Sequence, residues 1–471
     1  MKGDDFVFGM IGLGTMGRNL LLNMADHGFK VAGHDKDEKK VEALGTERTK
    51  GNVKGFTSVK EFIESLKKPR AIMMLVPAGK IVDNVIDELT PLLDKGDLII
   101  DGGNSHFTDT NRRVETLKSK GLHFFGMGIS GGEEGARKGP SMMPGGDQEA
   151  YKVVQSVFEA VAAKVNGEPC VTYIGPGASG HFVKMVHNGI EYGIMQLIAE
   201  TYEMMKKGLN LSDDETHSLF KEWTSGRQHS FLMEITRDIL AFKEKGSDHL
   251  LIDDIKDEAK SKGTGKWTSQ VAMDLQTPLS VIDAAVSMRD LSKYKALRTQ
   301  AAAMYGSEAV RLQGNADQLV KSLEEALYFS TIVAYAQGMH LLSQASKEYG
   351  YNLKMDRIAL IWRGGCIIRS AFLEDIHQAY KSDSGLQHLL LDKGIQKKVS
   401  TLVPGMRSIV SSAVNSGISL PAYTAAISYF DSFKSERMPS NIIQAQRDYF
   451  GAHTYELIGK EGVFHTQWFV K

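Results

Sequence analysis

A glycine-rich turn near the N-terminus constrains the fold more than any other feature of this sequence. Residues 12–17 read GLGTMG, between the apolar strand candidate DDFVFGMI and the helix candidate RNLLLNMADHG. Gly12 permits a tight turn, Gly14 lets the backbone approach a pyrophosphate, and Gly17 lets helix and strand pack closely. This arrangement predicts a dinucleotide site with the phosphates at the helix N-terminus. We assign to it the whole turn: Gly12, Leu13, Gly14, Thr15, Met16 and Gly17.

The chain divides into an α/β part and a helical part. Up to about residue 178, apolar runs such as FVFGMIGLG, AIMMLVP and DLIIDGG alternate with helix-like segments, which is typical of parallel β-α-β units. From Ser179 the strand signals vanish, and stretches such as QLIAETYEMMKKG carry helical periodicity. We predict a Rossmann-like α/β domain over residues 1–178, a large all-α domain over 179–435 and a C-terminal tail over 436–471.

Two stretches of the helical part resemble each other. GLNLSDDETHSLFKEWTSG (208–226) and GYNLKMDRIALIWRGG (350–365) share a Gly-x-Asn-Leu start and a Trp-x-x-Gly end. Their spacing differs by three residues, about one helical turn. The pattern favours an internal duplication as much as a chance similarity.

Charge and cysteine usage limit the classes of partner and the compartment. The 56 Lys and Arg residues nearly cancel the 57 Asp and Glu residues, so the net charge gives no sign of a nucleic-acid or anionic-membrane partner. Two cysteines, Cys170 and Cys366, are too few for a disulfide scaffold and lack metal-ligand spacing. The N-terminus lacks a signal-peptide pattern, and no apolar run approaches the roughly 20 residues of a membrane span. We therefore expect a cytoplasmic protein.

The end of the second strand candidate bears on the choice of dinucleotide. KVAGHD ends at Asp35, about 20 residues after the glycines, where a carboxylate can accept hydrogen bonds from the ribose hydroxyls and repels a ribose phosphate. Lys36 acts in the opposite direction, and Asp37 adds negative charge. These charges favour NAD over NADP, and an ordinary polar turn is the alternative interpretation.

Two loops follow buried strand candidates and are expected at the carboxyl end of the sheet, where ligands of α/β folds bind. DGGNS (101–105) places Asn104 where it could touch both nicotinamide and substrate. The loop MGISGGEEGARKGPSMMPGG offers the hydroxyl of Ser130 and the backbone donors of Gly131 and Gly132 to a carboxylate. From spacing alone, plain glycine turns explain both loops almost as well.

A polar stripe marks the helix candidate HFVKMVHNGIEYGIMQ (181–196). Steps of three and four residues place five side chains on one side: Lys184, His187, Asn188, Glu191 and Tyr192. Because the helix begins where the α/β part ends, the stripe can face the nicotinamide crevice. A lysine among apolar neighbours can have a lowered amine pKa, which suits a general base, and Glu191 is spaced to act separately as an acid. A solvated stripe is the alternative.

Taken together, the motifs closely resemble the decarboxylating 6-phosphogluconate dehydrogenase family. The resemblance rests on GLGTMG, DGGNS, SGGEEGARKGPSMMPGG, KMVHNGIEYGIMQ, KGTGKWT, WRGGCIIRS and RDYFGAHTY, and runs almost end to end. It implies a homodimer whose subunits each have a Rossmann-like domain, a duplicated helical domain and a tail that enters the partner subunit.

The resemblance also implies a reaction of the pentose phosphate pathway. Lys184 would take the hydroxyl proton of 6-phosphogluconate while hydride leaves for the nicotinamide. The resulting β-keto acid would lose carbon dioxide, with the protonated lysine stabilising the enolate oxygen. Glu191 would then protonate the carbon to give ribulose 5-phosphate. No metal is required.

Binding residues follow from the same resemblance. The substrate's carboxylate and hydroxyl end is expected on Asn104, Ser130, Gly131, Gly132, His187 and Asn188. Its phosphate is expected on Tyr192, Lys262 and Arg289, together with Arg447 and His453 from the other subunit. Cofactor contacts are expected from Val76, Pro77, Ala78 and Asn104, besides the turn and Asp35, Lys36 and Asp37. WRGGCIIRS is interpreted as helix packing, with no chemistry assigned.

The sequence departs from the family at two cofactor positions. NADP-using members typically show Asn-Arg-Thr where this chain has Asp35, Lys36 and Asp37, and Lys-Ala-Gly where it has Pro77, Ala78 and Gly79. Both changes remove a potential phosphate contact. Two other functions remain open: a β-hydroxyacid dehydrogenase for a smaller acid, which would lack the phosphate-binding cations, and a non-catalytic dinucleotide-binding protein.

Overall fold

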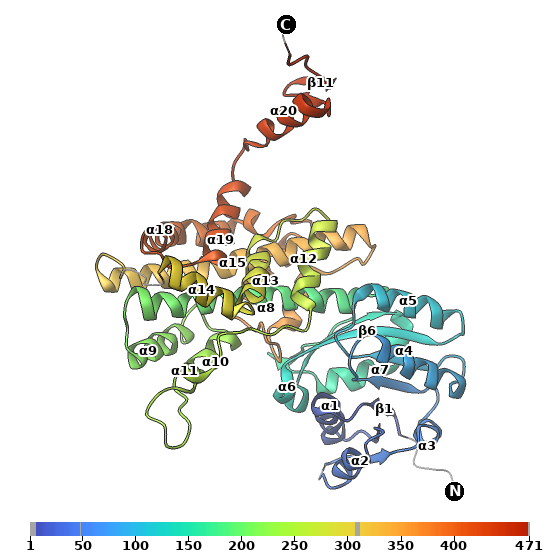
Figure 1. Cartoon of the computed structure of the whole chain (residues 1–471). Helices are drawn as coiled ribbons and strands as arrows, with labels where there is room; N and C mark the ends of the chain where they lie inside the picture. Colours follow the sequence, from blue (N-terminus) through green and yellow to red (C-terminus); the bar gives the residue numbers. More distant parts are fainter. Residues whose placement is uncertain (1–5, 48, 307–310, 470–471) are drawn as a thin grey trace.

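The computed structural model describes residues 6–47, 49–306 and 311–469. Figure 1 shows an α/β part at the N-terminal end, a helical part in the middle, and a C-terminal tail that stands away from both. Within the described ranges, no helix combines the length and apolar character needed to cross a bilayer.

The α/β part is built on one sheet with the strand order β3-β2-β1-β4-β5-β6-β7. The strands are β1 Phe8–Ile11, β2 Val31–His34, β3 Val53–Phe56, β4 Ala71–Met74, β5 Leu98–Asp101, β6 His123–Ser130 and β7 Ser141–Gly146. β1 to β6 run parallel, as predicted, but β7 pairs antiparallel with β6. The predicted pattern of parallel β-α-β units does not extend to β7. The link 131–140 between β6 and β7 is too short for the crossover of a dozen or more residues that a parallel neighbour needs.

Helices cover both faces of this sheet. They are α1 Thr15–Asp26, α2 Glu38–Gly45, α3 Val59–Glu64, α4 Lys80–Leu89, α5 Phe107–Lys118, α6 Gly132–Lys138 and α7 Gln148–Val161, with a short 3-10 turn at Thr90–Leu92. A two-stranded hairpin of β8 (Lys164–Val165) and β9 (Glu168–Pro169) follows. Neighbouring strand residues such as Met73 and Met74 point into different apolar clusters, and both are fully buried. Burial on both faces explains why these strands read as continuous apolar runs.

The second part is helical. Its helices are α8 Ser179–Glu203, α9 Asp213–Thr224, α10 Phe231–Ile239, α11 Leu251–Asp254, α12 Thr264–Asp274, α13 Ser280–Ser292, α14 Lys295–Tyr305, α15 Ala316–Glu348, α16 Met355–Trp362, α17 Phe372–Ser382, α18 Lys393–Asn415 and α19 Pro421–Phe433. A π-helical turn at Met204–Gly208 and a 3-10 turn at Leu389–Leu391 complete it. α15 packs against α8 and α18, and its Phe329 and Tyr335 lie with Trp362 in the core.

The two similar stretches occupy similar places in this part. α8 and α15 are both long, and each is followed by an asparagine in the left-handed conformation, Asn210 and Asn352, with φ of 53° in both cases. A short helix, α9 or α16, comes next. This repeated order supports the internal duplication.

α8 joins the two parts, because it starts on the sheet and continues into the helical core. A Cβ atom on Gly128 of β6 would lie 2.3 Å from Cβ of Lys184, and one on Gly126 would lie 2.4 Å from the His181 ring. β6 and α8 therefore approach more closely than a larger residue at position 126 or 128 would allow. This close approach fixes Lys184 beside the carboxyl end of the sheet. The limits 1–178, 179–435 and 436–471 remain our proposed domain limits.

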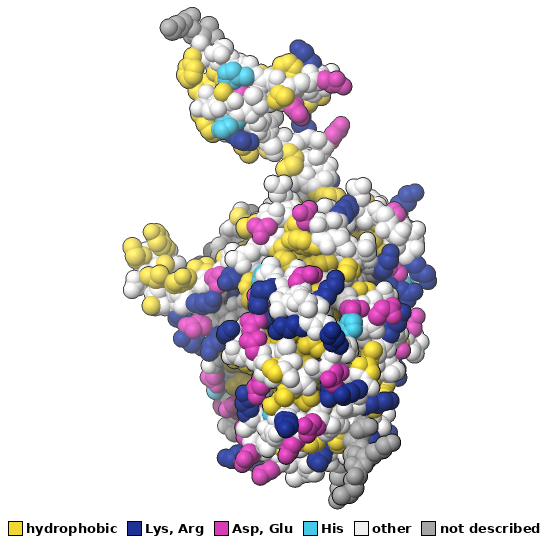
Figure 2. Space-filling model, turned by 90° about the vertical axis from the view of Figure 1, so that its right-hand side faces the viewer, with side chains coloured by type: hydrophobic (Ala, Val, Ile, Leu, Met, Phe, Trp, Pro, Cys, Tyr) yellow, Lys and Arg dark blue, Asp and Glu magenta, His cyan; other side chains and the backbone are white. Residues whose placement is uncertain are grey.

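The tail is a small unit of its own, with helix α20 (Ser440–Gly451) and a hairpin of β10 (Tyr455–Leu457) and β11 (Lys460–Phe464). Figure 2 shows it joined to the body by a narrow neck. Several of its large apolar side chains are exposed, among them Ile442, Ile443, Phe450, Ile458 and Phe469. Exposed apolar side chains that gather in one place are typical of protein interaction surfaces.

Candidate active site

The glycine turn has the geometry that a dinucleotide requires. Gly12 has φ of 92°, and a Cβ there would lie 2.5 Å from the Leu75 carbonyl oxygen. A Cβ on Gly17 would lie 1.9 Å from the Gly12 carbonyl oxygen, so glycine is needed for the close packing of α1 on β1. A Cβ on Gly14 would meet nothing within 4 Å. The open side of the turn therefore faces free space at the N-terminus of α1, where a pyrophosphate fits.

Beside the turn lies a cavity of about 290 Å³ that suits an adenosine. Asp35, at the end of β2, lines it, and its carboxylate accepts hydrogen bonds from the N–H of Leu13 (2.8 Å) and of Asp37 (3.0 Å). Burial pushes the pKa of Asp35 upward, but these N–H donors and Lys40 outweigh it, so the pKa lies below its usual value. The group is therefore a carboxylate at neutral pH.

The other two charges of this segment have local partners. Nζ of Lys36 lies 3.0 Å from the Glu88 carboxylate on α4, and both residues line the adenosine cavity. The Asp37 side chain caps α2 by accepting the N–H of Lys39 at 3.1 Å. This hydrogen bond helps to explain why α2 begins after Asp37. Contact between Asp37 and the cofactor stays a prediction.

A larger cavity, of about 710 Å³, opens where the two parts of the chain meet. Met16, Val76, Pro77, Ala78 and Asn104 line it from the α/β part, as predicted for the nicotinamide end. Lys262 and Trp267 line it from the helical part. The structure thus brings these five predicted cofactor residues and one predicted phosphate-binding cation around one space.

The polar stripe of α8 forms a buried cluster. Nδ1 of His187 lies 3.3 Å from Nζ of Lys184 and 2.9 Å from Oδ1 of Asn188. Asn188 donates through Nδ2 to Oγ1 of Thr264 at 3.1 Å. An oxygen of Glu191 lies 3.9 Å from His187 Nδ1. The solvated-stripe alternative is wrong, since Lys184 is only 5% exposed and His187 is fully buried.

Burial gives the two ionisable groups of the stripe opposite pKa shifts. It lowers the pKa of the Lys184 amine, which Glu191 and Cys366 offset only in part. It raises the pKa of Glu191 against the opposing effect of Lys184 and Arg289. A lysine that loses its proton easily and a carboxylic acid that keeps its proton are the pair that base and acid catalysis needs. His187 is neutral, because burial and then Lys184 hold its pKa well below the usual value.

The last residue of β6 is the predicted serine. Oγ of Ser130 lies 3.0 Å from Nε2 of His187 and accepts the N–H of Ile367 at 3.2 Å. Gly131 and Gly132 stand at the N-terminus of α6, and a Cβ on Gly131 would lie 2.7 Å from the Gly365 carbonyl oxygen. Ser130 therefore connects the α8 cluster with the segment after α16.

The predicted phosphate-binding residues are only partly assembled. The guanidinium of Arg289 lies 3.7 Å from the ring centre of Tyr192, and Arg289 donates to the Lys260 carbonyl oxygen at 3.1 Å. Arg447 and His453 are exposed on the detached tail, and Figure 1 shows that the tail does not reach the site of its own chain. One chain thus leaves the phosphate end open.

Sequence analysis missed Cys366 and Thr264 as members of the cluster. Sγ of Cys366 lies 2.9 Å from Nε2 of His187, so interpreting WRGGCIIRS as helix packing alone is wrong. The ring of Trp362 also stands edge-on to His187 at 5.7 Å between centres. The position of KGTGKWT within the family resemblance could have pointed to Thr264, whereas the spacing of Cys366 gave no signal.

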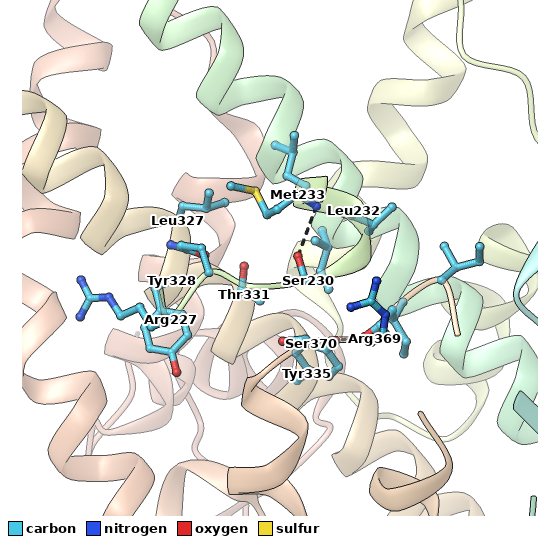
Figure 3. A pocket seen from close by; sticks show the side chains of 15 residues that line it. Arg227, Ser230, Leu232, Met233, Leu327, Tyr328, Thr331, Tyr335, Arg369 and Ser370 are labelled. Atoms are coloured by element: carbon cyan, nitrogen blue, oxygen red, sulfur yellow. Dashed lines mark hydrogen bonds between the residues drawn. The ribbon is translucent and has the colours of Figure 1, made fainter. Parts of the chain in front are cut away.

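A separate hollow in the helical part is too small for a substrate. It has a volume of about 20 Å³, room for one water, and is lined by residues of α10, α15 and the segment 367–370. Figure 3 shows Arg227, Tyr328 and Arg369 around it, and the dashed line marks the bond from the Met233 N–H to Oγ of Ser230, 3.3 Å long.

The fold and the site define a nicotinamide dinucleotide-dependent oxidoreductase. The NAD-binding domain model of 6-phosphogluconate dehydrogenase matches residues 7–175, and the model of its C-terminal domain matches residues 180–468. This chain belongs to the 6-phosphogluconate dehydrogenase family, so the resemblance inferred from the motifs is confirmed.

Relatives agree over nearly the whole length. The chain is 48% identical to the NADP(+)-dependent, decarboxylating 6-phosphogluconate dehydrogenase of Bacillus subtilis, over 98% of both chains. It is 49% identical to the decarboxylating enzyme of Homo sapiens, over 98% of this chain and 96% of that one. The 6-phosphogluconate dehydrogenase of Plasmodium falciparum, solved in its apo form and in complexes with NADP+ and with 6-phosphogluconate, matches with a TM-score of 0.95 and 42% identity. This match covers 98% of this chain and all of that one.

Proposed function

We propose that this chain catalyses the oxidative decarboxylation of 6-phosphogluconate to ribulose 5-phosphate and carbon dioxide, as the names of its relatives suggest. The observation that carries the proposal is the pair of a buried Lys184 and a largely enclosed Glu191 on one side of α8, with oppositely shifted pKa values. We infer the substrate from membership of the family, and the acid and the base from the geometry of the site.

Each member of the pair has its own proton to move. When bound, the nicotinamide supplies the hydride acceptor. Nζ of Lys184, whose pKa burial lowers, takes the hydroxyl proton of the substrate and then offers it to the enolate oxygen that develops as carbon dioxide leaves. Glu191, whose raised pKa favours the protonated acid, delivers a proton to the carbon while the enol O–H returns its proton to Lys184, which leaves the ketone.

Binding roles follow the same arrangement. Ser130 donates its hydroxyl proton to the substrate carboxylate, and the N–H groups of Gly131 and Gly132 at the start of α6 assist. Asn104, His187 and Asn188 orient the hydroxyl end. Tyr192, Lys262 and Arg289 hold the phosphate, where several cations suit a dianion.

Cofactor preference has two opposing arguments. The names of the relatives above favour NADP. The adenosine cavity favours NAD: among the described residues that line it, Lys36 is the only lysine or arginine, it pairs with the carboxylate of Glu88, and Asp35 lines the same cavity. A ribose phosphate would add charge beside these carboxylates. We propose NAD as the preferred cofactor of this chain.

The active site is proposed to be shared between two subunits. Arg447 and His453 lie on a tail that stands away from the body of its own chain and exposes several large apolar side chains. A homodimer in which each tail enters the partner would cover these side chains and complete the phosphate site. A cytoplasmic location stays a prediction.

The decisive experiment is reduced-nicotinamide formation with 6-phosphogluconate, compared between NAD and NADP over a range of cofactor concentrations, with carbon dioxide measured in parallel. Turnover with release of carbon dioxide supports the proposal. Turnover of 3-hydroxyisobutyrate instead would support the smaller-acid dehydrogenase. Dinucleotide binding without turnover of either acid would support the non-catalytic alternative.

A further inference from the structure

Cys366 faces the catalytic cluster although it belongs to the segment after α16. It is 3% exposed, and its sulfur lies 2.9 Å from Nε2 of His187, on the ring edge opposite Lys184. The segment around it is held in place: the hydroxyl of Tyr335 donates to the Ile368 carbonyl oxygen at 2.6 Å, and the N–H of Phe231 donates to the Arg369 carbonyl oxygen at 2.9 Å. The thiol therefore has a fixed position.

The partners of His187 determine its tautomer. Asn188 uses Nδ2 for Thr264, so the atom it presents to His187 is the acceptor Oδ1, and His187 Nδ1 carries the proton. Nε2 is then the acceptor. Two groups with a proton to give lie near it, the hydroxyl of Ser130 at 3.0 Å and the thiol of Cys366 at 2.9 Å.

Ser130 has only one proton to donate. In the proposed reaction that proton goes to the substrate carboxylate, while the serine oxygen accepts the N–H of Ile367. Once substrate is bound, Nε2 of His187 loses the serine as donor. Burial raises the pKa of the Cys366 thiol and lowers that of His187, so the pair remains a neutral thiol and a neutral imidazole.

We propose that Cys366 is a positioning residue, whose S–H donates to Nε2 of His187 in the substrate complex and so keeps the Nδ1–H tautomer directed at Asn188 and Lys184. The proposal rests on the proposed function, because it assigns the Ser130 proton to the substrate. It gives a role in catalysis to the segment WRGGCIIRS, to which the sequence analysis assigned no chemistry.

The test compares Cys366→Ala with Cys366→Ser in the full-length protein. Cys366→Ala is expected to lower kcat by roughly three- to tenfold, the range for one lost hydrogen bond, while the Kd for the dinucleotide is unchanged. Cys366→Ser restores an O–H donor and is expected to recover most of the loss. The matched control is Cys170→Ala, because Cys170 is equally buried but its sulfur lies 4.0 Å from the Leu360 carbonyl oxygen.

A tautomer measurement makes the test independent of turnover. Histidine labelled with ¹⁵N reports by NMR which ring nitrogen carries the proton, and a His187→Asn sample assigns the signal. We expect Nδ1–H in wild type and a mixture in Cys366→Ala with 6-phosphogluconate bound. Wild-type His187 with its proton on Nε2 would overturn the inference whatever the activity. So would equal kcat values for wild type and Cys366→Ala, or equal losses in the alanine and serine variants. An inactive wild type with the expected tautomers would contradict only the proposed function.

Discussion

Nζ of Lys184 lies 3.3 Å from Nδ1 of His187, inside a cluster that burial keeps largely free of water. Because burial lowers the pKa of the amine, Lys184 gives up its proton more easily than an exposed lysine, which suits the proposed role as base. An arginine at this position would keep its charge under all usable conditions. The base role proposed for this position therefore needs a lysine and not only a positive charge.

Lys184→Ala is expected to abolish turnover. We expect kcat to fall by about 1,000-fold or more, the upper range for loss of a general base, and Lys184→Arg to be equally inactive. Dinucleotide affinity should stay nearly unchanged, because Lys184 is absent from the residues that line the two cofactor cavities. Stopped-flow turnover and fluorescence titration of reduced nicotinamide measure the two quantities. Substantial residual activity in either variant would remove the base assignment.

We expect kcat/KM to decrease at both low and high pH. Below the lowered pKa of Lys184 the amine is charged and cannot accept the hydroxyl proton. Above the raised pKa of Glu191 the acid has lost the proton it must deliver. In Glu191→Gln the rate should drop by roughly 100-fold and the decline at high pH should disappear, because the titrating group is gone. A decline at high pH that persists in this variant would assign it to another group.

The sequence predicted the stripe of α8 correctly because its five residues lie within three turns of one helix, where spacing fixes direction. It could not predict that Lys36 meets Glu88, 52 positions away, or that Cys366 meets His187, 179 positions away. Contacts of that kind depend on how α4 and the segment after α16 pack, which no local pattern records. The reversal of β7 could have been inferred from the short link that precedes it.

Glu88 is expected to influence the choice between NAD and NADP. Its carboxylate lies 3.0 Å from Nζ of Lys36, and Glu88→Gln would free this cation for a ribose phosphate. Both side chains are exposed, so solvent screening limits the effect to about a two- to fivefold rise in the ratio of kcat/KM for NADP to that for NAD. Glu64→Gln is the matched control, because Glu64 pairs with Lys60 on the surface of α3. An unchanged ratio in Glu88→Gln would leave Asp35 as the main determinant.

Gly128 is expected to be essential for the contact between β6 and α8. In Gly128→Ala the added Cβ would lie 2.3 Å from Cβ of Lys184, so the helix must shift. Overpacking of this kind costs about 1–3 kcal/mol, and the displacement of Lys184 should lower kcat as well. Thermal unfolding and turnover check both effects. Gly45→Ala is the control, because a Cβ at Gly45 meets nothing within 4 Å; equal behaviour of the two variants would contradict the packing argument.

The proposed shared active site can be tested by mixing two variants, one with weakened substrate binding and one without the base. Arg447→Ala is expected to weaken binding of the phosphate end, and Lys184→Ala removes the base. If tails cross over, a mixed dimer has one site with both defects and one site with neither, since the intact Lys184 receives the intact Arg447 of its partner. Complete exchange of equal amounts should then restore roughly a quarter of the wild-type activity measured at low substrate concentration. Subunit exchange is verified by native mass spectrometry of differently tagged chains. Proven exchange without recovery would mean that Arg447 serves the site of its own chain or no site at all.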